Sequence, residues 1–203
     1  MERELLYVAL GDSTGTGVGA QSGGGYPERL VRLLRARLRL LNLCRSGATS
    51  ADVLTDQLPR ALRARPRLIT LGIGINDLGL QLPDESFALN LEEIAVGLRK
   101  LGAPIVILNL PDLALSPAVA RLVPRLLYEK RIEMFNEHVT ATAARHDLTL
   151  VDLYALSREI VPGRPELFSP DGYHPSALGY DEWARRMAPA VEQLLGVGVA
   201  ATG

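Results

Sequence analysis

Cysteine, lysine and histidine are scarce in this chain of 203 residues. Cys44 is the one cysteine, so neither an internal disulfide nor a metal cluster held by several cysteines can form. No apolar run approaches the roughly 18 residues of a membrane-spanning helix, and we expect no span. The chain also lacks a charged start followed by an apolar stretch and a cleavage site. This favours a cytoplasmic protein, although a secreted protein that had lost its leader would look the same.

A strong charge of either sign is also missing. The formal net charge is -1, and only two of the 22 basic residues are lysines. Bulk attraction to nucleic acid or to an anionic membrane is therefore not expected. The 47% of hydrophobic residues and the length suit one domain with one core. We expect that domain over residues 1–195, with a short tail at 196–203 that frays.

Short apolar runs alternate with segments of helical spacing along the chain. Strands are expected at residues 5–10, 41–44, 68–73, 104–110 and 148–153. Helices are expected at residues 26–40, 50–63, 85–101, 124–146 and 176–195. Residues 14–25 and 155–175 are interpreted as loops, rich in glycine and proline respectively. This alternation predicts an α/β fold with a parallel sheet covered on both faces.

Candidate functional residues follow several of these strands. In parallel sheets, ligands bind outside the carboxyl ends of the strands. Ser13, Gly47 and Asn76 follow the first three expected strands, and Asp171 and His174 lie in the loop after the fifth. Because the ends of parallel strands meet at one edge, we expect these residues to lie close together.

Asp171 and His174 form the most informative pair. A carboxylate three residues before a histidine in a turn can bind one ring nitrogen and leave the other free to accept a proton. Ser13 could supply that proton and act as a nucleophile. The other histidines, His138 and His146, lie in the expected 124–146 helix and are interpreted as surface or helix-end residues.

Acyl transfer by a serine also needs hydrogen-bond donors for the oxyanion. Gly47 could offer a backbone N–H with no side chain in the way, and Asn76 could offer its side-chain amide. Taken alone, Gly47 is equally well explained as a turn glycine, and Asn76 as part of an Asx turn.

Four sequence blocks together resemble the SGNH (GDSL-type) hydrolase family: Gly11-Asp-Ser13, Gly47, Gly74-Ile-Asn-Asp77 and Asp171-Gly-Tyr-His-Pro175. The resemblance implies that Ser13 is the nucleophile, His174 the base and Asp171 its orienting carboxylate. It also implies that Gly47, Asn76 and the Ser13 N–H form the oxyanion hole. The implied fold is a three-layer, flavodoxin-like α/β/α arrangement with a five-stranded parallel sheet, and the implied chemistry uses no metal or cofactor.

Two other classes of protein must be weighed against this hypothesis. Gly15-x-Gly17-x-x-Ala20 matches a dinucleotide-binding fingerprint, but the fingerprint should open a helix directly after the strand, and Ser13 and its neighbours intervene. A non-catalytic, carbohydrate-binding relative is disfavoured because all five site residues are present. Thr14 replaces the leucine of the GDSL pattern, which weakens substrate inferences from that loop.

Two aliphatic segments, residues 78–82 and 111–117, are expected near the site. Aromatic residues, which often line sugar sites, make up only 5% of the chain. We therefore predict a serine esterase with an apolar acyl pocket for short to medium acyl chains, possible substrates being small-molecule esters such as lysophospholipids or acylglycerols. A carbohydrate O-acetyl esterase and an acyl-thioesterase remain alternatives. The sequence indicates nothing about oligomeric state.

Overall fold

The computed structural model describes residues 4–34 and 36–196, which build one five-stranded sheet between two layers of helices. All neighbouring strands are parallel, and their order is β2-β1-β3-β4-β5. The strands are β1 (Leu5–Gly11), β2 (Leu38–Asn42), β3 (Leu68–Gly72), β4 (Ile105–Leu108) and β5 (Thr149–Val151). This is the flavodoxin-like order, so the predicted α/β fold is confirmed.

The inner strands are almost entirely apolar, with Thr70 of β3 as a buried polar exception, because helices cover both of their faces. Every residue of β3 and β4 is buried. Val8 of β1 lies between Leu41 of β2 and Ile69 of β3 in the parallel register. Continuous rather than alternating apolar runs are what a sheet buried on both faces requires.

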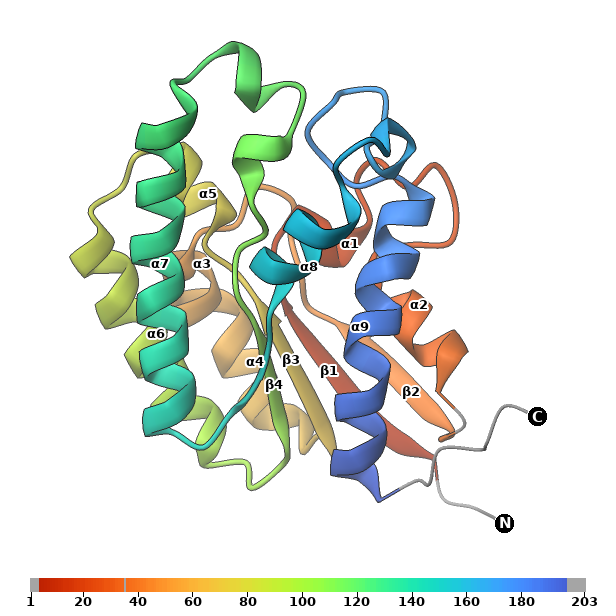
Figure 1. Ribbon diagram of the computed structural model, residues 1–203. Helices are drawn as coiled ribbons and strands as arrows, with labels where there is room; N and C mark the ends of the chain where they lie inside the picture. The colour runs from red at the N-terminus through yellow and green to blue at the C-terminus, as the bar shows by residue number, and fades with distance from the viewer. Residues whose placement is uncertain (1–3, 35, 197–203) are drawn as a thin grey trace.

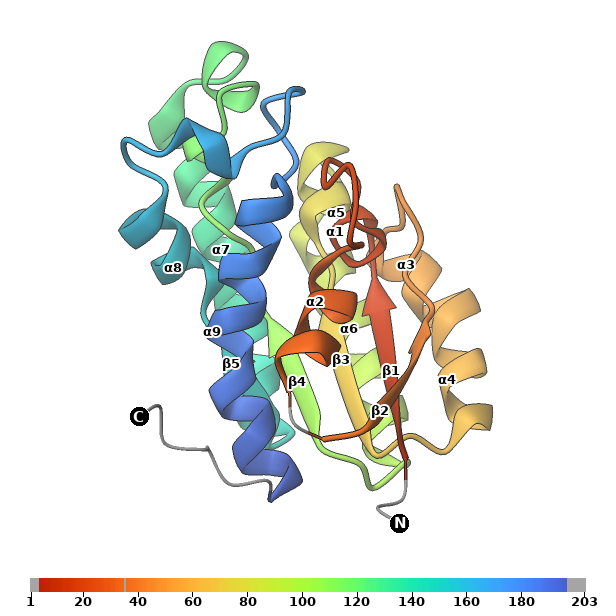
Figure 2. The same cartoon turned by 90° about the vertical axis from the view of Figure 1, so that its right-hand side faces the viewer.

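The two helical layers pack on opposite faces of the sheet, as Figures 1 and 2 show from two directions. One cluster of buried hydrophobic residues packs the sheet against a first layer of helices. A second cluster packs the opposite face of the sheet against a second layer. The first layer holds α3 (Ser50–Asp52), η1 (Val53–Gln57), α4 (Leu58–Ala64), α6 (Asp84–Arg99) and α7 (Arg125–Arg145). The second holds α2 (Tyr26–Leu33), α8 (Leu153–Ile160) and α9 (Ala177–Leu195).

Short elements gather at the carboxyl edge of the sheet, which is uppermost in Figure 1. They are α1 (Ser13–Thr16), α5 (Ile75–Gly79), and the 3-10 turns η2 (Leu113–Leu115), η3 (Val119–Arg121) and η4 (Pro165–Leu167). The beginning of β1 and the end of α9 lie at the opposite edge. No helix within residues 4–34 and 36–196 combines the length and the hydropathy needed to cross a bilayer.

The expected helix over residues 26–40 is wrong beyond Leu33. Helix α2 ends there, Leu34 adopts an extended backbone, and β2 begins at Leu38 rather than at residue 41. Parallel pairing of β2 with the neighbouring strand, Leu5 opposite Leu38, decides the conformation. The helical spacing of the leucines was therefore misleading past residue 33.

The loop expected at 155–175 was also too long. Residues 153–160 form α8, and the Asp152 side chain caps it by accepting from the Ala155 N–H. Ser176 does cap the last helix, as its N-cap position shows. Apart from Gly196, the tail predicted at 196–203 lies outside the described residues.

Candidate functional site

Ser13 lies at a sharp turn where strand β1 becomes helix α1. Gly11 passes so close to the Gly72 carbonyl of the neighbouring strand that a Cβ would collide with it. Asp12 is the N-cap of α1 and accepts from the Thr14 N–H at 2.9 Å. The first N–H groups of a helix have no partner within the helix, so Ser13 presents its hydroxyl beside an unpaired backbone donor.

Ser13, His174 and Asp171 form a continuous hydrogen-bonded chain. Asp171 Oδ2 lies 2.7 Å from His174 Nδ1, and His174 Nε2 lies 3.1 Å from Ser13 Oγ. Since a carboxylate only accepts, Nδ1–H donates to it and Nε2 is left to accept the Ser13 proton. The geometry is that of a nucleophile, a general base and an orienting carboxylate. The structure thus brings together the three residues that the sequence singled out.

The loop that carries Asp171 is tied down by its own hydrogen bonds. Asp171 Oδ1 accepts from Ser169 Oγ at 2.7 Å, the Tyr173 N–H at 2.7 Å and the His174 N–H at 2.9 Å. Burial opposes ionisation of Asp171, but the bonds from His174, the Tyr173 N–H and Ser169 outweigh it and hold the pKa of this carboxyl well below its usual range. Asp171 is therefore a fixed negative charge against the imidazole.

A second segment anchors this loop from the other side. The Gly172 carbonyl accepts from Ser116 Oγ at 2.7 Å and from the Ala118 N–H at 3.0 Å. Ser116 is fully buried. Sequence reasoning did not single out Ser116, because a serine before Pro117 looks like an ordinary turn residue.

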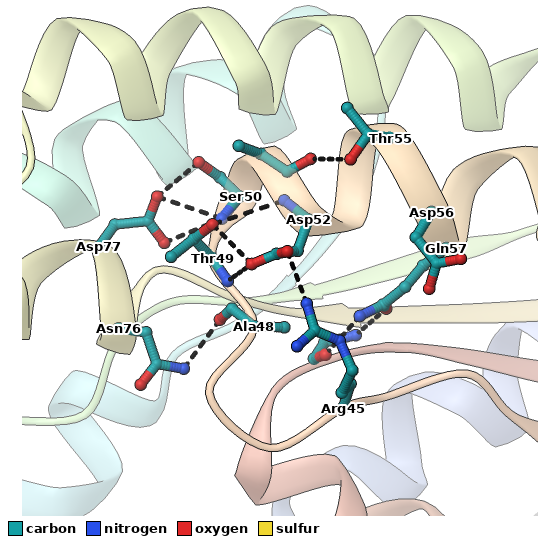
Figure 3. Close-up of polar contacts among 12 residues, drawn as sticks. Arg45, Ala48, Thr49, Ser50, Asp52, Thr55, Asp56, Gln57, Asn76 and Asp77 are labelled. Atoms are coloured by element: carbon teal, nitrogen blue, oxygen red, sulfur yellow. Dashed lines mark hydrogen bonds and ion pairs between the residues drawn. The ribbon is translucent and has the colours of Figure 1, made fainter.

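Gly47 and Asn76 lie at one turn at the carboxyl edge of the sheet. Gly47 has φ of +78°, which favours glycine, and the space where a Cβ would stand is empty. Asn76 Nδ2 donates to the Ala48 carbonyl at 2.8 Å, as Figure 3 shows. A side-chain amide has two N–H bonds, so the second remains available for a bound group.

Two further contacts fix this turn. Asp77 accepts from the Ser50 N–H at 3.0 Å and from Ser50 Oγ at 2.5 Å (Figure 3). Burial raises the pKa of Asp77, although the Ser50 bonds oppose the rise. The Gly-Ile-Asn-Asp block therefore uses Asn76 and Asp77 together to hold the neighbouring loop.

Gln57 is a positioning residue that the sequence analysis missed. It is fully buried, and its amide forms two bonds with one backbone unit: it accepts from the Gly11 N–H and donates to the Gly11 carbonyl, both at 2.8 Å. The wide turn of the π-helix η1 brings Gln57 to this position (Figure 3). A glutamine within an amphipathic helix gives no sequence signal of such a role.

Asp12 is a buried carboxylate directly before Ser13. Its Oδ1 accepts from the Thr14 N–H and from Thr14 Oγ1, whereas its Oδ2 is buried with no hydrogen-bond partner among the residues that the structure describes. Burial raises the pKa of Asp12 to about 6, against the effects of the Thr14 bonds and of His174.

An apolar pocket opens from Ser13 and His174 into the space between η2, α8 and α9. Its volume is about 50 Å³, and its apolar walls include Ile75, Leu113, Ile160, Val161, Phe168 and Trp183. The predicted wall at residues 111–117 is present, with Pro111 to Leu113 and Ser116 among the lining residues. Residues 78–82, the other aliphatic segment expected near the site, do not line this pocket: Leu78 is buried in the core and Leu80 is 65% exposed.

The glycine-rich loop does not form a dinucleotide fingerprint. Gly17 and Gly19 have φ of +84° and +90°, which interrupts the helix that such a motif needs. A Cβ on Gly19 would meet Pro175 and His174, so the loop packs on the Asp171 segment instead. In the part of the chain that the structure describes, no three histidine, cysteine or acidic side chains form a metal-ligand group.

The other histidines lie away from Ser13. His146 ends helix α7 and lies 2.6 Å from Glu92 through Nε2, and His138 lies 3.5 Å from Asp84. Both contacts join α6 to α7 in the first helical layer, as expected for surface and helix-end residues.

Comparison with known proteins gives consistent matches. The model of the GDSL-like lipase/acylhydrolase family matches residues 9–182. The GDSL-like esterase Rv1075c of Mycobacterium tuberculosis is 30% identical over 184 residues, which cover 87% of this chain and 58% of the length of Rv1075c. Esterase TesA of Pseudomonas aeruginosa is 26% identical over 196 residues, covering 93% of this chain and 88% of TesA.

Solved structures share the fold over nearly the whole chain. The lipase/acylhydrolase from Enterococcus faecalis superposes with a TM-score of 0.80 at 21% identity, covering 98% of this chain and all of that one. A Clostridium thermocellum family 3 carbohydrate esterase gives a TM-score of 0.77 at 18% identity, covering 97% of this chain and all of the other. At these identities the likeness concerns the fold.

Proposed function

The chain belongs to the GDSL-like lipase/acylhydrolase family of ester hydrolases, and we propose that it cleaves short-chain carboxylic esters through an acyl-enzyme on Ser13. The observation that carries this proposal is the continuous contact from Asp171 through His174 to Ser13. Nothing else in the described residues joins a hydroxyl to a base in this way beside an apolar pocket.

In the first half of the reaction, Ser13 Oγ attacks the ester carbonyl carbon and gives its proton to His174 Nε2. Asp171 stabilises the resulting imidazolium, because its carboxylate is fixed against Nδ1. The carbon–oxygen bond to the alcohol then breaks, and His174 returns the proton to the leaving oxygen. The products are a free alcohol and Ser13 carrying the acyl group.

The tetrahedral intermediate places a negative charge on the former carbonyl oxygen. The N–H groups of Ser13 and Gly47 and the free amide proton of Asn76 are the donors that we assign to this oxygen. They are held in place before the reaction, so they stabilise the transition state without having to reorganise. Water activated by His174 then attacks the acyl-enzyme, releases the carboxylic acid and restores Ser13.

The pocket volume favours a short acyl group. An engineered apolar cavity of about 150 Å³ holds a benzene molecule, so a pocket of about 50 Å³ suits an acyl chain of about two to four carbons. Its walls are aliphatic and aromatic, and each buried CH₂ contributes up to about 0.8 kcal/mol. We therefore assign the pocket to the acyl side of the ester.

The nucleophile is tested with a fluorophosphonate probe and mass spectrometry. We expect labelling at Ser13, and a fall in kcat of about 10⁴- to 10⁶-fold for Ser13→Ala on a soluble p-nitrophenyl ester. Ser22→Ala, in the same glycine-rich loop, is the control and should keep its activity. Activity of Ser13→Ala within tenfold of the wild type would refute the mechanism.

The acyl preference is tested with esters of one alcohol and graded acyl length. We expect kcat/KM to rise up to about fourfold per CH₂ from acetyl to butyryl and to fall for octanoyl. Ile160→Ala should move the optimum to a longer chain, whereas Val96→Ala, an exposed truncation on α6, should not. Acetylated sugars or acyl thioesters that far outpace the butyryl ester would assign a different substrate class.

A further inference from the structure

Five large aliphatic side chains are exposed together at the carboxyl edge of the sheet. Leu80, Leu122, Leu126 and Leu127 are 65%, 81%, 74% and 67% exposed, and Val123 is 37% exposed. We call these five residues the leucine patch. Single exposed leucines are common on soluble proteins, but a contiguous apolar group marks an interaction surface.

The patch is one surface although it comes from two segments. The end of α5 and the beginning of α7 border a common groove, whose lining includes Leu78, Leu122, Val123 and Leu127. Arg131 of α7 donates to the Leu82 carbonyl at 2.9 Å and so ties the two segments together. Figure 1 shows both segments at the same upper edge of the molecule.

Positive charge predominates in the segment that carries four of the five patch residues. Residues 118–131 hold four basic residues, Arg121, Arg125, Lys130 and Arg131, against the single acidic Glu129, which pairs with Arg125 at 2.8 Å. The local excess of three positive charges contrasts with the net charge of -1 for the whole chain. The near-neutral total therefore concealed a locally basic segment, although Asp84 and Glu85 follow the other segment, which carries Leu80.

The patch adjoins the proposed active site. The Ala118 N–H, one residue before η3, bonds the Gly172 carbonyl between Asp171 and His174. Asn76, the assigned oxyanion donor, belongs to the same helix α5 whose end carries Leu80. A surface that binds the patch would therefore lie at the same edge of the sheet as Ser13.

We propose that the leucine patch docks the protein on the surface of anionic lipid aggregates. Leucines enter the boundary between headgroups and acyl chains, while arginine and lysine approach anionic headgroups. A second copy would bring identical basic residues against this patch, and their mutual repulsion favours an anionic lipid surface over a homodimer. The docking proposal does not depend on the proposed esterase chemistry. If both hold, the substrate is a short-chain ester of a lipid-like alcohol, and this last step rests on the proposed function.

The test uses Ser13→Ala, so that no substrate is consumed, in sedimentation with vesicles. Vesicles of phosphatidylcholine mixed with phosphatidylglycerol are compared with vesicles of phosphatidylcholine alone. We expect binding to the mixed vesicles that weakens with salt. Adding Leu122→Ser with Leu126→Ser, or Arg121→Gln with Lys130→Gln, should lower the affinity about tenfold or more. Leu89→Ser with Val96→Ser, exposed on α6 at 68% and 44%, is the control and should bind normally.

Each outcome separates docking from catalysis. The patch variants in the wild-type background should hydrolyse a soluble short-chain ester within about twofold of the wild-type rate. Failure to bind mixed vesicles, or equal binding of patch and control variants, would overturn the docking proposal and leave the esterase intact. If the wild type forms a dimer and the leucine substitutions dissociate it, the patch binds a second copy of the chain instead. Vesicle binding without Ser13-dependent hydrolysis would refute the proposed function alone.

Discussion

Asn76 combines two tasks in one side chain, because one amide proton binds Ala48 and the other faces the site in our assignment. We predict that Asn76→Ala lowers kcat about 10²- to 10³-fold, roughly 3–4 kcal/mol, with little change in KM. The reason is that the donor bonds mainly the oxyanion of the transition state. Steady-state kinetics on a soluble ester measures both constants.

The control for this change is Asn90→Ala. Asn90 Nδ2 donates to Ser50 Oγ at 2.9 Å, so it belongs to the same polar network without being assigned to the oxyanion. We expect a much smaller loss of kcat. Equal losses in the two variants would mean that Asn76 acts by supporting the loop.

Asp12 should make stability depend on pH. A carboxyl whose pKa is raised to about 6 by burial binds a proton more tightly when folded than when unfolded. Its contribution is therefore fully favourable below about pH 4 and is lost as the pH rises through 6. We compare the free energy of unfolding of Asp12→Asn with that of the wild type at each pH. We predict that this difference shifts in favour of the variant by about 2–3 kcal/mol between pH 4 and pH 8, because only the wild type loses stability as the pH rises.

Denaturant unfolding at the two pH values measures this difference. Asn keeps an oxygen for the Thr14 N–H, so the helix cap is preserved. Asp56→Asn, whose side chain is 54% exposed, is the matched control measured at the same two pH values. A difference for Asp12→Asn that does not change with pH would show that the carboxyl ionises normally.

At the scale of elements, the π-helix η1 supports the strand end before Ser13. Gln57→Leu would remove both hydrogen bonds to Gly11 and leave the buried N–H of Gly11 without a partner. We predict a loss of about 2–3 kcal/mol in the free energy of unfolding, together with a fall in kcat. Gln193→Leu, an exposed change on α9, should leave both unaffected; unchanged kcat in Gln57→Leu would limit that residue to stability.

The errors in the sequence-based elements have a common cause. Strand β2 is only half-buried at the sheet edge, so Leu38 and Leu40 lack the continuous apolar run that identified β3 and β4. Their spacing continued the helix before them. For α8, Asp152 is a recognisable N-cap residue, but the four prolines in 155–175 favoured the prediction of a loop. Local spacing could not reveal which segment pairs with β1.

The proposed site was more predictable than its supports. Gly11-Asp-Ser13 and Asp171-to-Pro175 are short segments whose residue types indicate their chemistry directly, and the fold brings them together. Gln57 and Ser116 act through contacts across 46 and 56 residues of sequence. Such contacts depend on the packing of whole layers, which one sequence does not display.

At the scale of the whole molecule, Arg29 joins helix α2 to the last helix, α9. Its guanidinium lies 2.5 Å from Asp181 of α9 and also donates to the Ser22 and Gly24 carbonyls. We predict that Arg29→Gln lowers the free energy of unfolding by about 2 kcal/mol, since a partly exposed pair is weaker than a fully buried one. Thermal unfolding measures it, with Arg32→Gln as the exposed control. A loss below that of Arg32→Gln would show that Arg29 is dispensable.

The separation of Ser13 from His174 by 161 residues also has a consequence during synthesis. Ribosomes add about 5–20 residues per second, so the base follows the nucleophile after an interval on the order of ten seconds. Throughout that interval the nascent chain holds a serine with no histidine to activate it. In the proposed mechanism, a half-made chain therefore has no ester-cleaving activity, which arises only when the final quarter of the polypeptide folds onto the first.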